Sequence, residues 1–163
     1  MQRVLIVIVA TALLSACISS RTSLRAIQHA EARWVAMGIS DYSFKLLKNA
    51  QIPDTECGES DRPIEIEVRD GRTVKFGTCD VSSRYALSFG SIPAIFSTLR
   101  AERARKPPSL EVDFNDALGY PEIISINNAR WVTDHGVTYI VRDLRKADGG
   151  SLPNTSLERA RER

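Results

Sequence analysis

Few side chains in this 163-residue sequence are chemically reactive, and they fall into two groups. The chain has three cysteines, Cys17, Cys57 and Cys79, and two histidines, His29 and His135. A thiol can carry a lipid, bind a metal or form a disulfide, and imidazole is the most common general base in enzymes. The surroundings and spacing of these five residues therefore decide which chemistry is open to the chain.

Cys17 stands at the end of a segment that has the pattern of an export signal. Arg3 gives the first residues a positive charge, and an uncharged apolar run follows from Val4 to Leu14. The residues Leu14-Ser15-Ala16-Cys17 resemble the lipobox of bacterial lipoproteins, where small residues let the signal peptidase fit closely around the backbone. We therefore predict cleavage between Ala16 and Cys17, with lipid attached to the Cys17 thiol. An uncleaved anchor helix is the alternative, but the roughly 20-residue stretch that it needs ends in polar residues.

The lipid would fix the location of the protein. Several acyl chains exceed the two signals that stable membrane anchoring requires. Ile18, rather than Asp, follows Cys17, which in enteric-type bacteria resembles the signal for transport to the outer membrane. The sequence thus predicts a lipid-anchored protein of the bacterial cell envelope, on the inner leaflet of the outer membrane and facing the periplasm.

Charge and composition exclude some classes of partner. The formal net charge is only +2, and no run of Lys and Arg has the density that reads nucleic acid or anionic headgroups. We predict membrane attachment through Cys17, a periplasmic or other envelope protein as the partner, and no nucleic acid. The oligomeric state has no signature in the sequence.

With Cys17 assigned to lipid, Cys57 and Cys79 remain as a pair. In an oxidising compartment such a pair forms a disulfide, here closing a loop of about 22 residues worth roughly 3 kcal/mol. A metal site is the alternative, but the two cysteines are not in a C-x-x-C arrangement and no histidine is near either. A redox-active pair lacks the same spacing. We predict a structural disulfide and no metal.

The histidines do not indicate an active site. His29 falls on a predicted helix beside Arg25 and Arg33, where a solvated side chain is expected. Asp134-His135 lies on a turn between strands, and adjacent turn residues rarely point toward each other. No serine nucleophile elbow, phosphate loop or H-E-x-x-H motif is present. We predict no enzyme activity and no cofactor; a hydrolytic enzyme using Asp134 and His135 is the weakest alternative.

Hydrophobic periodicity predicts an α+β domain. The pattern is helical from Ser19 to Ala36, with Leu24, Ile27, Glu31, Trp34 and Val35 near one face at three- and four-residue steps and Gly38 as the left-handed cap. Ser91 and Pro93 begin a second helix that ends before Pro107 and packs on the sheet. Residues 80–90 are expected to be irregular. Antiparallel strands are predicted over 41–48, 64–69, 74–76, 110–114, 123–126 and 137–144, the last three following the second helix.

The second and third strands are predicted to form a hairpin. A two-residue turn at Asp70-Gly71 would place a charged residue opposite Val74, so we predict a three-residue loop that pairs Val74 with Ile66. The helices should then cover one face of the sheet. The other face should turn a set of charged side chains toward water, namely Glu65, Glu67, Arg69 and Lys75.

Two places could bind a partner or a ligand. Tyr120 and Pro121 lie at a turn, where we favour packing of the aromatic ring against the sheet edge; an exposed aromatic residue that anchors another protein is the alternative. An apolar pocket between the helices and the sheet, lined by Trp34, Phe44 and Phe96, would instead bind a small apolar ligand. We favour an interaction module, with the ligand-binding domain as the alternative.

Several motifs in order resemble the DUF6174 family. They are Trp34, Ile39-Ser40-Asp41-Tyr42-Ser43-Phe44, Val68-Arg69-Asp70-Gly71, Ile92 to Phe96, and Leu118-Gly119-Tyr120-Pro121-Glu122-Ile123. The family consists of small bacterial proteins, many of them lipoproteins, without an established activity, so the resemblance implies a fold and a location but no catalytic residues. We expect a signal peptide over 1–16, a lipidated N-terminus and linker over 17–23, the domain over 24–145 and a disordered tail over 146–163.

Overall fold

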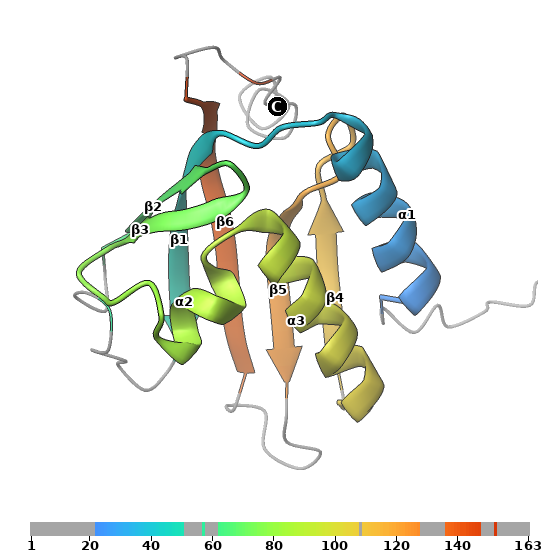
Figure 1. Cartoon of the computed structure of the whole chain (residues 1–163). Coiled ribbons are helices and arrows are strands. Elements are labelled where there is room, and N and C mark those ends of the chain that lie inside the picture. Colours follow the sequence, from blue (N-terminus) through green and yellow to red (C-terminus); the bar gives the residue numbers. More distant parts are fainter. Residues whose placement is uncertain are drawn as a thin grey trace, which may run out of the picture.

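The computed structural model describes residues 22–50, 57, 62–107, 109–127, 136–147 and 152. Within these residues the chain forms three helices and six strands (Figure 1). The order confirms the predicted α+β fold and adds one helix, α2, to it. The elements are α1 (Leu24–Ala36), β1 (Tyr42–Ala50), β2 (Ile64–Arg69), β3 (Arg72–Phe76), α2 (Arg84–Phe89), α3 (Ile92–Arg105), β4 (Ser109–Phe114), β5 (Pro121–Asn127) and β6 (Gly136–Lys146).

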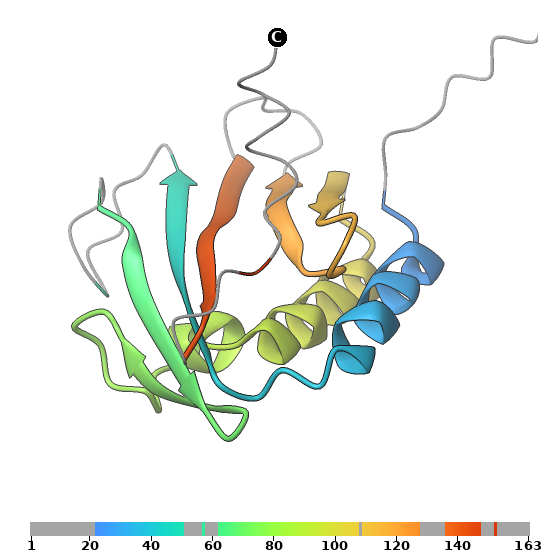
Figure 2. The same cartoon turned by 90° about the horizontal axis from the view of Figure 1, so that it is seen from above.

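The strands form one antiparallel sheet in the order β3-β2-β1-β6-β5-β4. β1 and β6 pair along most of their length at its centre, so they join the first three strands to the last three. The helices α1, α2 and α3 lie on one face, and among the described residues no helix lies on the other (Figure 2). The sheet therefore has a covered face and an uncovered face.

The hydrophobic core lies between the helices and the covered face. Tyr42, Phe44 and Leu46 of β1 are buried, while Lys45 between them faces the other side, as the two-residue period of a strand requires. α3 buries a stripe at three- and four-residue steps, made of Ile92, Ile95, Phe96 and Leu99. Both patterns follow from the sequence, and together they fix α3 on the sheet.

Serine caps begin the helices on this face. The Ser91 hydroxyl accepts a hydrogen bond from the backbone N–H of Ala94, as predicted for the start of α3. The Ser83 hydroxyl caps α2 in the same way, but this six-residue helix is too short for its periodicity to stand out. The hydroxyl of Tyr42 accepts a further hydrogen bond, at 3.0 Å, from the backbone N–H of Ile92. The first residue of α3 is thus fastened to β1.

The hairpin of β2 and β3 differs from the prediction. Its turn has two residues, Asp70-Gly71, both at positive φ (48° and 72°), as a type I′ turn requires. The register then shifts, so that Phe76 rather than Val74 pairs with Ile66. The shift is a bulge that leaves Val74 52 % exposed. The predicted three-residue loop was wrong because the bulge restores the apolar face that a plain two-residue turn would lose.

The buried stripe of α1 is also narrower than predicted. Ile27, Ala30 and Trp34 are buried, whereas Leu24 and Val35 are 45 % and 67 % exposed. At 3.6 residues per turn, Leu24 and Val35 lie to one side of the face that the three buried residues form. Only this narrow face of α1 is therefore packed.

Cys57 and Cys79 form a disulfide, as the cysteine count predicted. Cys57 is buried, and Cys79 packs on the core just after β3. Gly77 makes room for the bridge, because a Cβ there would lie 2.8 Å from the carbonyl oxygen of Cys57. The bridge thus fixes the chain before β2 to the end of β3.

The described chain begins at the edge of the sheet. The backbone N–H of Thr22 donates to the carbonyl of Leu110 at 2.8 Å, and the Thr22 hydroxyl accepts from the N–H of Val112 at 2.8 Å. Both partners lie on β4, which is an edge strand. Ser23 then caps α1.

At the other end of the chain, Leu152 is only 6 % exposed and belongs to the core cluster. The prediction of a tail without packed residues is therefore wrong at this position. The other residues after Ala147 lie outside the described part.

Candidate interaction site

Several predicted site residues lie outside the described residues: Ala16, Cys17, Asp134 and His135. Their lipidation, cleavage and acid–base roles therefore stay predictions. His29 is exposed on α1, and its side chain has no hydrogen-bond or ion-pair partner within the described part. The described residues contain no group of three or more His, Cys, Asp or Glu side chains that could hold a metal ion.

The turn at Tyr120 and Pro121 is buried, so Tyr120 packs as we favoured, and the alternative of an exposed aromatic anchor at this turn was wrong. Tyr120 is 3 % exposed, and Pro121 is buried as well. The reason is Gly119, which has a φ of +82° and lies so close to α1 that a Cβ would come within 2.4 Å of the Ala30 carbonyl oxygen. The Arg33 guanidinium donates to the Asp116 carbonyl at 2.6 Å from the same helix. The turn is therefore tucked against α1.

Polar groups hold this turn from inside. Asn115 accepts hydrogen bonds from the backbone N–H groups of Ala117 and Leu118 and donates to the Glu122 carboxylate at 2.7 Å. The Tyr120 hydroxyl donates to the same carboxylate at 3.2 Å. Burial and the nearby carboxylate raise the pKa of Tyr120 well above its ordinary value. Tyr120 therefore keeps its proton at neutral pH, and the cluster supports the fold.

The space proposed for an apolar ligand is filled by side chains. Trp34, Phe44 and Phe96 are at most 3 % exposed. The Trp34 ring packs edge-on against Tyr42 with 5.3 Å between centroids, and Tyr42 stacks on Phe44 at 6.1 Å. Trp34 also packs against Tyr120. The motifs that carry the family resemblance thus meet around Trp34 and build the core.

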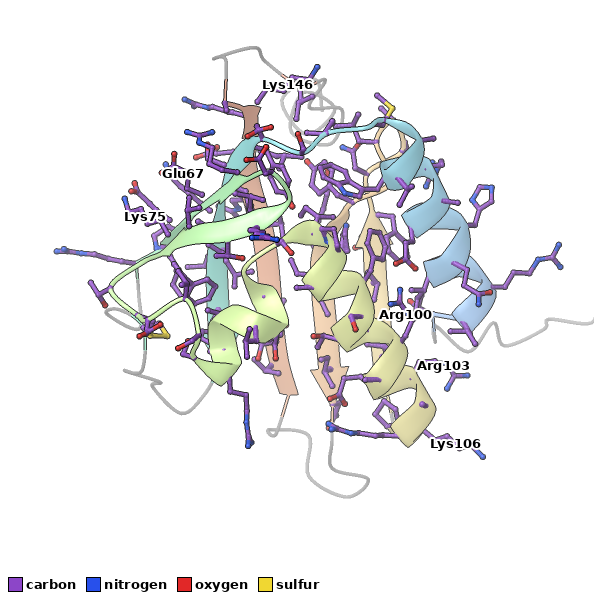
Figure 3. The ribbon with its side chains drawn as sticks, viewed as in Figure 1. Glu67, Lys75, Arg100, Arg103, Lys106 and Lys146 are labelled. Carbon is purple, nitrogen blue, oxygen red and sulfur yellow. A yellow bond between two sulfur atoms is a disulfide. The ribbon has the colours of Figure 1, made fainter. Side chains whose placement is uncertain are left out.

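The uncovered face of the sheet carries a hollow of about 510 Å³. It lies over β2, β1 and the end of β6, and it contains the charged residues that the hairpin pattern placed toward water. Figure 3 shows two of them, Glu67 and Lys75, on the hairpin, and Lys146 at the end of β6. The charged lining of the hollow consists of Lys45, Glu65, Glu67, Arg69, Lys75, Asp143, Arg145 and Lys146.

Three ion pairs neutralise most of this charge. Lys45 lies 2.9 Å from Asp143, and Lys75 lies 3.2 Å from Glu65. Arg69 pairs with Glu67 on the same strand. The hydrogen bond from the Lys45 ammonium lowers the pKa of the Asp143 carboxyl, so the pair stays charged at neutral pH.

A second hollow, of about 540 Å³, adjoins the first one where β1 begins and β6 ends. The two share Arg69, Lys146 and Ala147. The second hollow is built around Asp41, whose carboxylate accepts hydrogen bonds from the Ser40 hydroxyl at 2.5 Å and from the N–H of Asp70 at 3.2 Å. These hydrogen bonds, with that from Ser40 the larger cause, lower the pKa of Asp41. We call the two adjoining hollows the polar corner.

The polar corner brings together the ends of three strands that are far apart in the sequence. The backbone N–H of Gly71 donates to Ser40, and that of Ala147 donates to Asp41, so the β2–β3 turn and the end of β6 both close on the start of β1. The side chains of two cations of the corner, Arg145 and Lys146, form no hydrogen bond or ion pair within the described residues. The corner therefore presents fixed ion pairs beside two cations able to bind an anionic group.

Sequence reasoning found only part of this site. It placed Glu65, Glu67, Arg69 and Lys75 on the water-facing side, which the structure confirms. It did not find Lys146, since the tail was predicted to begin at that residue. It also missed Asp143 and Arg145, because strict alternation from Tyr139 and Val141 would turn both toward the core. The register of β6 shifts at this point, where Asp143 has a φ of 54°, and the sequence carries no periodic signal for that shift.

The fold and this site define a small α+β domain whose sheet is covered on one face and polar on the other. The chain belongs to a family of unknown function, DUF6174, whose sequence model matches residues 26–146. No curated protein and no solved structure matches the chain. In the described part, no helix combines the length and the hydrophobicity needed to span a bilayer.

Proposed function

We propose that this protein is a lipid-anchored interaction module of the bacterial cell envelope, whose polar corner binds an acidic segment of another envelope protein. Cys17 carries the lipid, and the protein resides on the inner leaflet of the outer membrane, facing the periplasm. The protein acts by binding and not by catalysis.

Two observations support the anchor and the compartment. The sequence Leu14-Ser15-Ala16-Cys17 has the lipobox pattern, and Cys17 is the one cysteine left when Cys57 and Cys79 are joined. Disulfides persist in oxidising compartments such as the periplasm, which agrees with export. The domain begins at Thr22, only a few residues after Cys17.

The observation that carries the proposed binding role is the charge arrangement of the polar corner. Three of its carboxylates are engaged with Lys45, Arg69 and Lys75, and the fourth, that of Asp41, accepts hydrogen bonds instead. Five cations against four carboxylates leave a net charge of +1, and Arg145 and Lys146 are the cations outside the ion pairs. An acidic segment complements that charge, and the fixed ion pairs beside it give orientation. β6 is an inner strand, so the partner is held by side chains and not by strand addition.

The two alternatives receive no comparable support. A small apolar ligand would need space among Trp34, Phe44 and Phe96, and those side chains are packed against their neighbours. No contact of the described residues favours hydrolysis. We therefore retain the interaction module alone.

The anchor is tested by mass spectrometry of the mature N-terminus. We expect a chain that begins at Cys17 and carries diacylglycerol and an amide-linked acyl chain, and a Cys17→Ser variant that no longer fractionates with outer membranes. Cleavage at another position, or membrane fractionation of the variant, would contradict the proposal.

The partner is tested by photocrosslinking in the native host. A photoreactive amino acid is placed at Ala147, which borders both hollows, and in a matched control at Leu87, which is exposed on α2. We expect an adduct with one envelope protein at the first position alone, lost when Arg145→Glu and Lys146→Glu are combined. An adduct that persists after this charge reversal, or equal adducts at both positions, would remove the role of the corner.

A further inference from the structure

A set of cations gathers at the end of the domain where the described chain begins. Thr22 is bonded to Leu110 near the start of β4, and α3 ends four residues before Leu110 in the sequence, at Lys106. Figure 3 shows Arg100, Arg103 and Lys106 along the last turns of α3, across the sheet from Lys146 and the hairpin. The first turn of α1 lies at this same end and carries Arg25 (Figure 1).

Carboxylates neutralise only part of this charge. Arg100 pairs with Glu31 of α1, and Arg105 pairs with Glu102 at 2.6 Å. Within the described residues, Arg25, Arg103 and Lys106 have side chains without an ion-pair or hydrogen-bond partner. We name these three residues the anchor-side basic surface. Arg103 and Lys106 belong to a short basic stretch at the end of α3, but Arg25 lies almost eighty positions away, so the sequence does not group the three.

The lipid would hold this surface at the membrane. Five peptide units join Cys17 to Thr22, which covalent geometry limits to about 18 Å. By the same rule Lys106 lies within about 14 Å of Leu110, to which Thr22 is bonded. The 13 residues of α1 separate this end from the polar corner by about 20 Å. A tether this short keeps the basic end, rather than the corner, beside the headgroups.

We infer that the anchor-side basic surface binds the anionic phospholipid headgroups of the membrane that holds the lipid anchor. Cations near an anionic leaflet are attracted within a Debye length of about 8 to 10 Å. Leu24, 45 % exposed in the same helical turn as Arg25, adds an apolar contact at the interface. The domain then stands with its polar corner directed away from the bilayer. This inference rests on the proposed lipid anchor.

Two lysines of the same molecule provide the test. Lys106 at the basic surface and Lys146 at the polar corner are both exposed and without an ion pair in the described part. The full-length mature lipoprotein is reconstituted into phosphatidylglycerol-containing vesicles or into phosphatidylcholine vesicles. Both samples are briefly acetylated, and the modification of each lysine is measured by mass spectrometry.

We expect acetylation of Lys106 to slow at least about fivefold in the anionic vesicles, the factor that one basic residue contributes at such a surface. High salt should reverse the protection, and Lys146 should react alike in both vesicles. Combining Arg25→Gln with Arg103→Gln should abolish the protection of Lys106, while the control Arg145→Gln should leave it intact.

Flotation of the vesicles and the lysine reactivities test the lipid anchor and the headgroup binding separately. Protein that floats with neither kind of vesicle overturns the lipid anchor itself. Protein that floats with both, while Lys106 is equally reactive in both or is protected no more than Lys146, overturns the basic surface alone.

Discussion

The two ends of the domain both carry cations, but the cations have different neighbours. In the polar corner most of them are fixed by carboxylates, as Lys45 is by Asp143 at 2.9 Å. On the anchor-side basic surface, Arg25, Arg103 and Lys106 have no such partner in the described part. Unfixed cations suit a surface without a defined shape, such as headgroups, whereas fixed ion pairs suit a partner with one orientation. The arrangement of charge, more than its amount, therefore distinguishes the two ends.

The two ends are joined through α1, so the largest disturbance should come from displacing that helix. Gly119→Ala places a methyl group 2.4 Å from the Ala30 carbonyl oxygen at a φ of +82°. Strain and overpacking together should lower the free energy of unfolding by about 4 kcal/mol. Urea denaturation measures this loss.

Gly38→Ala is the matched control, because Gly38 also has a positive φ (+61°) but nothing within 4 Å of a Cβ. It should cost about 1 kcal/mol from backbone strain alone. Equal losses in the two variants would show that the contact with α1 is unimportant.

Removing the disulfide should have the next largest effect on the free energy of unfolding, and it should leave the polar corner and the anchor-side basic surface unchanged. Combining Cys57→Ser with Cys79→Ser should lower the free energy of unfolding by about 3 kcal/mol, because the unfolded chain loses a constraint across 22 residues. The reactivities of Lys106 and Lys146 in the folded variant should stay those of the parent. Urea denaturation measures the change in stability, and acetylation measures the two lysine reactivities. A changed ratio of the acetylation rates of Lys106 and Lys146 would show that the disulfide also affects the structure of one of the two ends.

Tyr42→Phe tests the link between the two ends. The Tyr42 hydroxyl holds α3, which carries two residues of the basic surface, to β1, which borders the polar corner. Loss of the 3.0 Å hydrogen bond leaves the Ile92 N–H buried without a partner, at a cost of about 1 to 2 kcal/mol at pH 7.

In the parent protein, the contribution of Tyr42 to stability should also depend on pH. Burial raises the pKa of Tyr42 to about 12, above its unfolded value near 10. The contribution to stability is therefore complete below about pH 10 and is lost as the pH rises toward 12. Between about pH 10 and 12, the unfolding temperature should fall less for Tyr42→Phe than for the parent. An equal fall would contradict this role of Tyr42.

The smallest effect should come from Asp143→Asn, which acts on the polar corner alone. Because the folded pKa of Asp143 is lowered, its contribution is present above the unfolded pKa of about 3.9 and disappears as the pH falls through the folded value. At pH 7 the variant should lose less than about 1 kcal/mol, as for an exposed ion pair, and at about pH 2 it should match the parent.

Glu102→Gln breaks an exposed pair with Arg105 on α3 and serves as the control, with a loss of about 0.3 kcal/mol. Thermal unfolding at both pH values measures the two variants. A difference between Asp143→Asn and the parent that persists in acid would mean that Asp143 acts other than through its charge.

Much of the fold could be predicted because local patterns and long-range packing agree. The alternation of Tyr42, Phe44 and Leu46 gave β1, and Ser91 gave the start of α3. The disulfide followed from counting cysteines once Cys17 was assigned to lipid. Each of these signals is contained within one element or within the composition.

The remaining features depend on contacts between distant segments. The bulge at Val74 is chosen by packing of the whole sheet, so the hairpin alone could not reveal it. Tyr120 has a turn sequence, but Gly119 lets that turn lie against α1. The polar corner needs the end of β6 beside the start of β1, about a hundred residues apart. Strand order supplies that proximity, and periodicity does not encode it.

Thr22 also bears on how neighbouring copies behave. The proposed lipid anchor would confine many molecules to one surface and raise their effective concentration, which favours pairing between exposed sheet edges. The two hydrogen bonds of Thr22 occupy the outward carbonyl of Leu110 and the outward N–H of Val112 on β4. The opposite edge, β3, is five residues long, bulged and charged at Lys75. Thr22 thus occupies backbone groups of the β4 edge that a second copy would need in order to join the two sheets.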